Sequence, residues 1–268
     1  MNAESDELLC RQDGAVATLT LNRPERHNTW TPTMGPRLEA LVRQCADDES
    51  IRVIVITGAG RTFCGGADMS VLQSAQESGV NPLARRARSD DDFAQRYSFL
   101  LGIPKPIICA LNGPAVGIGA VLPMFCDLRY AAAHARIGAL FVRRGLVAEH
   151  GMAWLVPRLI GTAHAMDLLL TGRMIGADDA HRMGLVSAVF PQESFAADVA
   201  ARAAELATTV SPRAAGIVKR QVYQAWRQTL AEAAHAADAE LPGCIASEDF
   251  REGVRHFVEK RPAAFTGR

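Results

Sequence analysis

Two glycine-rich stretches stand where backbone N–H groups could bind an oxygen that becomes negatively charged. Residues 60–69 read GRTFCGGADM and residues 112–120 read NGPAVGIGA. Each follows an apolar run typical of a buried strand and precedes residues typical of a helix start. The first turn of a helix leaves N–H groups unpaired, and they favour an anion. Two such turns could direct one N–H each at the same oxygen, which is the geometry that stabilises an enolate or a thioester oxyanion.

One carboxylate, Glu149, stands in a third glycine-containing stretch, GLVAEHG at residues 145–151. Its apolar neighbours should raise its pKa, which suits a base that must also return the proton. The alternative is that Glu149 only caps the following helix, where its charge would complement the positive helix end. The adjacent His150 is a second candidate acid, base or orienting donor, although a lone histidine is more often structural.

Composition bounds the possible functions. The chain has 268 residues and a formal net charge of zero, which fits one large domain or a domain with a helical appendage. Without a basic run, nucleic acid and an anionic membrane are poor partners. The six cysteines have no metal-like spacing, and most stand in apolar runs, so we expect reduced thiols and no metal site. No signal peptide or membrane span is evident, so a cytoplasmic protein is expected.

Strands are predicted at residues 16–21, 53–57, 107–111 and 128–132. The second of these is continuously apolar, as expected for a sheet covered on both faces. A helix is expected to begin with Thr31 as its N-cap and Pro32 at its first position. Residues 71–92 are mostly polar and contain an arginine cluster, and they predict a mobile flap that becomes a helix by about Asp92.

The composition changes to helix after Gly161. Helices are expected at residues 162–170, 177–183 and 194–209, and Ser247 should cap a last helix that ends near Lys260. The fold class is therefore α/β followed by helices. We expect a core with the active site at residues 1–200 and a helical oligomerisation region at residues 201–268. The alanine-rich C-terminal segment carries more apolar residues than one helix layer needs, which predicts contacts between copies.

The sequences FCGGAD at residues 63–68 and NGPAVGIG at residues 112–119 resemble motifs of the enoyl-CoA hydratase/isomerase (crotonase) family. The similarity runs from about Val16 to Phe265. The resemblance implies a crotonase-like spiral of ββα repeats and C-terminal helices that mediate trimer contacts. It also implies a homotrimer or dimer of trimers that acts on an acyl-CoA, with coenzyme A as part of the substrate and no permanently bound cofactor.

The resemblance assigns the oxyanion hole to the backbone N–H groups of Ala67 and Ile118. Ile118 departs from the family, in which glycine is usual there. The coenzyme A contacts of the family map onto two sets of residues. The first set is Glu25, Arg26, Gly65, Gly66, Asp68, Met69 and Gly117. The second set is Phe257 and Lys260, which would reach the site from the last helix of this chain or of a neighbouring subunit. The apolar substrate pocket is expected from Val121, Met124, Leu140, Phe141 and Trp154.

The resemblance also indicates which chemistry is missing. Hydratases of the family add water with two glutamates, and those positions are Val121 and Phe141 here. Members that shift double bonds carry an acid at the position of Glu149. Isomerisation of an enoyl-CoA is therefore favoured, with Glu149 as the acid and base. The alternatives are a hydratase or acyl-CoA hydrolase that uses Glu149 or His150, and a non-catalytic acyl-CoA-binding protein; RNA binding is disfavoured by the neutral charge.

Overall fold

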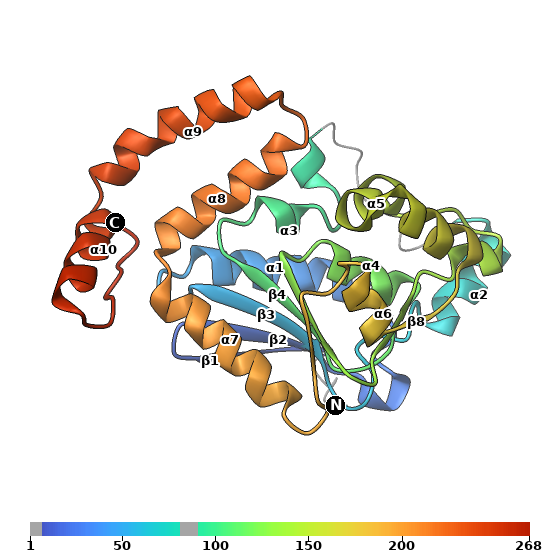
Figure 1. The fold of residues 1–268 in the computed structure, drawn as a ribbon. Coiled ribbons are helices and arrows are strands. Elements are labelled where there is room, and N and C mark those ends of the chain that lie inside the picture. Colours follow the sequence, from blue (N-terminus) through green and yellow to red (C-terminus); the bar gives the residue numbers. More distant parts are fainter. Residues whose placement is uncertain (1–6, 81–90) are drawn as a thin grey trace.

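The computed structural model describes residues 7–80 and 91–268. Helices surround one large sheet in this part of the chain (Figure 1). Six strands form it in the order β1-β2-β3-β4-β6-β9. They are β1 (Leu8–Asp13), β2 (Val16–Leu21), β3 (Val53–Gly58), β4 (Ile107–Leu111), β6 (Leu128–Ala132) and β9 (Ala188–Phe190). β1 is antiparallel to β2, and the other neighbours pair in parallel. The four predicted strands are confirmed within one residue, and β1 and β9 are additional.

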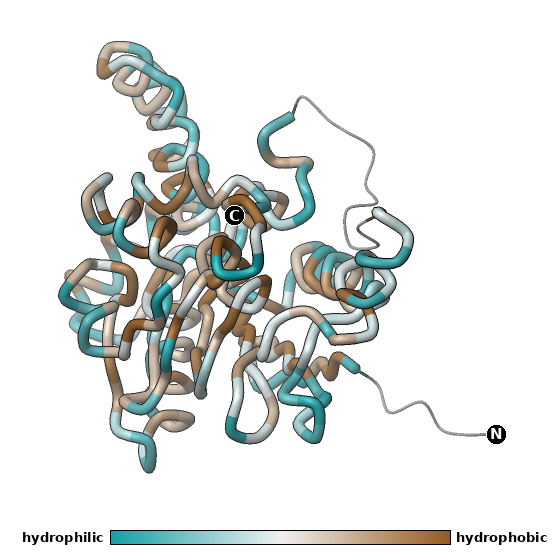
Figure 2. The backbone as a smooth tube through the Cα atoms, turned by 90° about the vertical axis from the view of Figure 1, so that its right-hand side faces the viewer, coloured by the Kyte–Doolittle hydropathy of each residue, from teal (hydrophilic) through white to brown (hydrophobic). Residues whose placement is uncertain are grey.

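Both faces of this sheet are covered, as the continuous apolar run of β3 predicted. Successive side chains of a strand point to opposite faces. Ile54 and Ile56 belong to the larger cluster of buried residues, whereas Val53 and Val55 belong to a second cluster. That second cluster includes buried side chains of α7 (Phe195–Thr209), which packs against the sheet. Figure 2 shows hydrophobic residues gathered in the inner segments and hydrophilic residues at the outer turns.

A second, small sheet contains β5 (Ala115–Val116), β7 (Arg136–Gly138) and β8 (Ile175–Gly176). An isolated bridge joins Cys64 to Ala115. Strands of the large sheet are thus followed by a short strand or bridge and then by a helix. The three units are β3, Cys64 and α2 (Met69–Ser78); β4, β5 and α4 (Ile118–Met124); and β6, β7 and α5 (Met152–Thr171). This repeated unit is the expected ββα repeat, and it brings the starts of α2 and α4 to the same place.

The helix predicted to begin at Thr31 begins later. It is α1 (Met34–Asp47), and its N-cap is Thr33, so the predicted cap was wrong by two residues. The buried Trp30 forms a bridge with Ala67, which holds the preceding backbone extended. Thr31 still contributes, because its Oγ1 accepts a hydrogen bond of 3.3 Å from the backbone N–H of Met34.

The flap predicted at residues 71–92 was wrong for its first part, which is helix α2. The Asp68 carboxylate caps this helix by accepting a hydrogen bond of 3.2 Å from the backbone N–H of Ser70. Gly79 ends the helix in the left-handed conformation, with φ of 67°. A short 3-10 helix at Asp92–Ala94 and α3 (Phe99–Gly102) follow later in the chain. Residues 81–90, with the arginine cluster, lie outside the described residues.

The C-terminal helices are α6 (Ala177–Arg182), α7, α8 (Pro212–Ala225), α9 (Leu230–Ile245) and α10 (Glu248–Glu259). Lys219 fixes α8 to the body, because its Nζ donates a hydrogen bond of 2.8 Å to the Leu100 carbonyl and lies 2.7 Å from the Asp127 carboxylate. Helices α9 and α10 extend away from the body (Figure 1). The predicted start of the last helix is confirmed, since Ser247 caps α10. The boundary expected after residue 200 lies within α7.

Exposed apolar side chains are frequent on the two protruding helices. They include Leu230, Leu241, Ile245, Phe250, Val254, Phe257 and Val258. Monomeric proteins rarely leave so many large apolar side chains together in water. In the described residues, no helix is both long and apolar enough to span a membrane.

Candidate active site

The two glycine-rich turns lie against each other. The backbone N–H of Val116 donates a hydrogen bond of 2.9 Å to the Cys64 carbonyl oxygen. A Cβ atom on Gly119 would lie 2.4 Å from the same oxygen, a distance that backbone atoms do not tolerate. Glycine at position 119 therefore lets the start of α4 approach the turn before α2.

The arrangement of backbone groups leaves the expected N–H groups available. In the bridge between Trp30 and Ala67, the Gly66 carbonyl accepts a hydrogen bond of 2.7 Å and the Asp68 N–H donates one of 3.0 Å. The N–H of Ala67 consequently faces away from Trp30. Ile118 is the first residue of α4, where an N–H has no partner inside its helix. In the described part of the chain, neither N–H is bonded to a backbone acceptor.

Isoleucine at position 118 is accommodated without backbone strain. The residue with the unusual conformation is its neighbour Gly117, with φ of 54° and ψ of −121°. Ile118 itself is helical and does not have positive φ. The departure from the usual glycine therefore does not disturb the backbone that would form the hole.

Glu149 and His150 lie on the loop between the 3-10 helix at Phe141–Arg144 and α5. Burial raises the pKa of the Glu149 carboxyl above its ordinary value, and the nearby Arg96 opposes that shift. The N-cap of α5 is Gly151, and no side chain caps the helix. Glu149 contributes only its carbonyl oxygen, which accepts a hydrogen bond of 3.1 Å from the Met152 N–H. The helix-cap interpretation of the Glu149 side chain is thus wrong.

His150 is held as a neutral ring. Burial, assisted by the charge of Arg96, lowers the pKa of His150 to about 4. Its ring meets the Tyr97 ring edge to face at a centroid distance of 5.1 Å. At neutral pH His150 therefore carries no proton that it could donate as an imidazolium, and it is a weak base.

A cavity of about 230 Å³ joins these groups. Eight of the predicted site residues line it, together with His150. They are Gly65, Gly66, Ala67, Met69, Gly117, Ile118, Phe141 and Glu149. The lining also includes residues that the sequence did not indicate, namely Thr29, Val71, Leu72, Ala75, Arg144 and Leu146. Three of these belong to α2, and predicting that helix would have revealed their shared face from their spacing.

Four residues predicted for the substrate pocket lie outside the lining of this cavity. Val121 is fully buried within α4, and Met124 borders a separate cavity of about 20 Å³. Leu140 stands in a turn with φ of 37°. Trp154 is 40% exposed, and its ring packs against Trp226 at a centroid distance of 5.2 Å.

The residues predicted to bind coenzyme A fall into three places. Gly65, Gly66, Met69 and Gly117 line the cavity, while Glu25 and Arg26 occupy an exposed turn beside it. That turn is held there because the Gly65 N–H donates a hydrogen bond of 2.8 Å to the His27 carbonyl. Phe257 and Lys260 belong to the end of α10, on the opposite side of the molecule from α2 (Figure 1). Within one chain, these two residues therefore lie apart from the cavity.

Asp68 has a structural task in this chain. Burial alone would raise its pKa, but hydrogen bonds from Ser70, Arg23 and Thr29 together lower it to about 2. The Arg23 Nη1 lies 3.1 Å from the Asp68 carboxylate, which also caps α2. The side chain therefore fixes the turn that presents the Ala67 N–H. No group of three potential metal ligands occurs among the residues that the structure describes.

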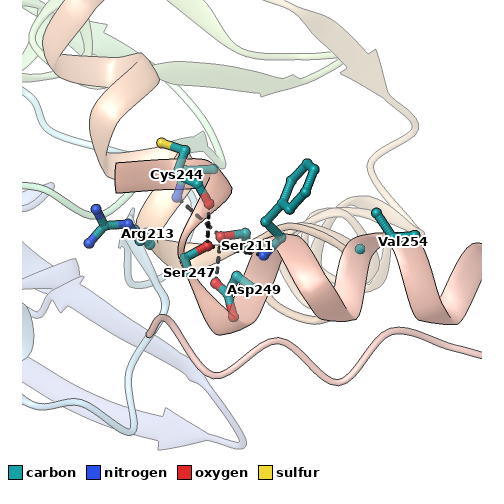
Figure 3. Close-up of a pocket in the computed structure, with 9 residues that line it drawn as sticks. Ser211, Arg213, Cys244, Ser247, Asp249 and Val254 are labelled. Atoms are coloured by element: carbon teal, nitrogen blue, oxygen red, sulfur yellow. Dashed lines mark hydrogen bonds between the residues drawn. The ribbon is translucent and has the colours of Figure 1, made fainter. Parts of the chain in front are cut away.

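A larger hollow of about 400 Å³ lies between the start of α8 and helices α9 and α10 (Figure 3). Its polar groups already satisfy one another. Ser211 donates a hydrogen bond of 2.5 Å to Asp249, and Ser247 donates one of 2.7 Å to the Cys244 carbonyl. Asp249 also accepts hydrogen bonds from the N–H groups of Thr266 and Gly267. This hollow joins the helices of the C-terminal region and offers no group poised for catalysis.

Comparisons with known proteins agree with this geometry. The family model described as enoyl-CoA hydratase/isomerase matches residues 11–268. The 1,2-epoxyphenylacetyl-CoA isomerase of Escherichia coli K12 is 35% identical over 97% of this chain and 98% of its own length. A probable enoyl-CoA hydratase of Rhodobacter capsulatus is 37% identical over 94% of this chain and 95% of its own.

Solved structures resemble the whole chain as well. A probable enoyl-CoA hydratase/isomerase of Mycobacterium abscessus superposes with a TM-score of 0.87 at 33% identity, covering 98% of this chain and 99% of that one. An enoyl-CoA hydratase subunit of Geobacillus kaustophilus gives a TM-score of 0.86 at 31% identity. These neighbours confirm the predicted crotonase fold. Sequence, fold and cavity together show that this chain belongs to the enoyl-CoA hydratase/isomerase (crotonase) family.

Proposed function

We propose that this protein moves a double bond in the acyl group of an enoyl-CoA. The observation that carries the proposal is that one cavity is lined by Ala67, Ile118 and Glu149. Glu149 would take a proton from the α-carbon of a β,γ-enoyl thioester and return it to the γ-carbon. The N–H groups of Ala67 and Ile118 would hold the thioester oxygen while it is an enolate. A carboxyl group with a raised pKa suits both halves of this transfer.

The same cavity is poorly equipped to add water. Val121 and Phe141 occupy the positions of the two hydratase glutamates, and both are buried apolar residues. His150, the remaining candidate for activating water, has a pKa of about 4 and is a weak base at neutral pH. Glu149 alone would have to orient water and also protonate the carbon, so hydration and hydrolysis are less well supported. The Escherichia coli relative is named 1,2-epoxyphenylacetyl-CoA isomerase, so its name supports isomerisation of an acyl-CoA in general and not a double-bond shift in particular.

We also propose that the enzyme works as a homotrimer or a dimer of trimers. Phe257 is 80% exposed on α10, and the neighbouring Lys260 lies at the end of the same helix. In an assembly of copies, this helix end could meet the coenzyme A bound to a neighbour, with Lys260 near a phosphate and Phe257 near the adenine. Light scattering should give the mass of three or six chains, and a monomer would contradict the proposal.

Proton transfer can be followed directly. The protein is incubated with a β,γ-enoyl-CoA in deuterium oxide, and mass spectrometry locates deuterium in the recovered thioesters. Isomerisation predicts deuterium at the α- and γ-carbons and the appearance of the conjugated α,β-enoyl-CoA. A hydroxyacyl product would favour the hydratase, release of free coenzyme A would favour the hydrolase, and binding without any exchange would favour a non-catalytic protein.

A further inference from the structure

A group of hydrogen-bond donors lies behind the cavity and has nothing to bind. Within the described part of the chain, three buried polar atoms lack a hydrogen-bond partner, and they are Trp30 Nε1, Arg96 Nη1 and Tyr97 Oη. Trp30 is 1% exposed and Tyr97 is 2% exposed. Leaving a buried donor unsatisfied costs about 1–3 kcal/mol for each group, and more for a charged one.

The three side chains form one cluster. A methyl group built on Gly35 would lie 3.7 Å from Arg96 Nη2 and 3.9 Å from Trp30 Nε1, so both side chains face the same point. The Trp30 and Tyr97 rings meet at a centroid distance of 6.0 Å. Two separate segments supply the cluster, namely the extended segment that contains Trp30 ahead of α1 and the segment just before α3 that contains Arg96 and Tyr97. No motif in the sequence predicts that these three side chains lie together.

The cluster adjoins the groups proposed for catalysis. Tyr97 packs against the ring of His150, which lines the cavity. The charge of Arg96 acts on the pKa of both Glu149 and His150. The cluster therefore adjoins the part of the cavity that Glu149 and His150 line.

The positive charge of the cluster indicates which kind of ligand group could bind its unsatisfied donors. In the described residues, no carboxylate lies within ion-pair distance of Arg96, and the titratable groups that face it are Glu149, His150 and Tyr97. Burial favours the neutral form of all three, since it raises the pKa of Glu149 and of Tyr97 and lowers that of His150. In the described residues, the Nη1 atom of the guanidinium therefore has no hydrogen-bond partner. A carboxylate would satisfy the cluster, because its two oxygens accept several hydrogen bonds and no donor is required from it.

We propose that Arg96, Tyr97 and Trp30 form a subsite for a carboxylate at the far end of the acyl group, so that the preferred substrate is the coenzyme A thioester of a dicarboxylic acid. The inference rests on the proposed function, because it assumes that the thioester binds between Ala67 and Ile118. Arg96 would pair with the carboxylate, while the Tyr97 hydroxyl and the Trp30 N–H would donate the further hydrogen bonds. The atoms are sealed from solvent in the free protein, so the carboxylate must enter as His150 and Tyr97 move apart.

A binding experiment separates this inference from the reaction. Hexanoyl-CoA and adipyl-CoA have acyl chains of the same length and cannot isomerise, and they differ in a methyl or carboxylate end. Calorimetry should show that the wild-type protein binds adipyl-CoA about 10- to 100-fold more tightly, as expected for hydrogen bonds to a charged group. Arg96→Met should reduce this ratio to near one while binding of hexanoyl-CoA persists. Tyr97→Phe, which removes one oxygen and should fold, should reduce the ratio by several-fold.

Arg43→Met is the matched control. Arg43 is another arginine close to an aromatic ring, that of Phe99 at 5.5 Å, but it is paired with Glu39 and does not belong to the cluster. Its ratio should equal that of the wild type. The inference is overturned if the wild type does not prefer adipyl-CoA, or if Arg96→Met and Tyr97→Phe keep the preference. Failure to bind either thioester would instead refute the proposed acyl-CoA function.

Discussion

Replacement of Glu149 by glutamine tests the proposed proton transfer most directly. The amide has nearly the shape of the carboxyl group but cannot accept and return a proton. Loss of a general acid or base typically lowers the rate by a factor of about 10²–10⁴. The structure places the expected loss toward the upper part of that range, because the neighbouring His150 has a pKa of about 4 and cannot replace the carboxylate efficiently. Deuterium exchange into a β,γ-enoyl-CoA should fall by this factor.

Binding and assembly should not change in this variant. The Glu149 side chain does not cap α5, and burial already penalises its charged form, so the neutral amide should leave stability equal or slightly higher at neutral pH. Glu77→Gln, at an exposed position of α2, is the control and should exchange at the wild-type rate. Glu149→Asp should retain a small part of the exchange, since withdrawing the carboxylate by about 1 Å can cost about 10² in rate. Exchange by Glu149→Gln at the wild-type rate would refute the reasoning and redirect attention to His150.

Two further perturbations follow from the charges of the site. His150→Asn should reduce the acid sensitivity of the fold: the pKa of His150 is lowered from 6.5 to about 4, so the native state binds fewer protons than the unfolded state between these values. The free energy of unfolding of the wild type should therefore be at its full value above pH 6.5 and fall by about 3 kcal/mol toward pH 4. Asparagine tolerates the positive φ of this position. In urea titrations at the two pH values, the His150→Asn variant should lose less of its free energy of unfolding than the wild type. Lys260→Glu should weaken coenzyme A binding more at low salt than at high salt, because its proposed partner is a phosphate; equal affinity at low salt would exclude Lys260 from the site.

The residues that could be predicted from the sequence are those whose role is local. Apolar runs predicted the four central strands, and the resemblance of the two glycine-rich turns to the family motifs assigned the hole to the backbone groups of Ala67 and Ile118. Glu149 was predicted because it stands in an apolar stretch at the position where family members that shift double bonds carry an acid. The start of α2 was predicted, but its course beyond residue 71 was missed because its exposed face is polar, and only Val71 among its residues is buried. The role of its apolar face, which lines the cavity, becomes evident only in the folded structure.

What the sequence could not provide depends on contacts between distant segments. Asp68 was predicted to contact coenzyme A through its backbone, and the sequence did not indicate that its carboxylate would bind Arg23 and Thr29, which are far from it in the chain. Trp154 is large and apolar, as expected of a pocket residue, yet its ring packs against that of Trp226 at the surface. The cluster of Trp30, Arg96 and Tyr97 carries no motif at all. Spacing along the chain cannot reveal such groups, because tertiary packing alone brings them together.

The low polarity of the cavity serves two needs of the proposed reaction at once. Burial keeps His150 neutral and raises the pKa of Glu149, so the site holds one carboxylate that is a stronger base than an exposed glutamate. The apolar side chains at positions 121 and 141 exclude the pair of acids that would direct water to the double bond. In the proposed reaction, an enolate formed there would be protonated by Glu149. Returning an acid to position 141 alone should therefore not create a hydratase, because the second acid and the space for an ordered water would still be absent.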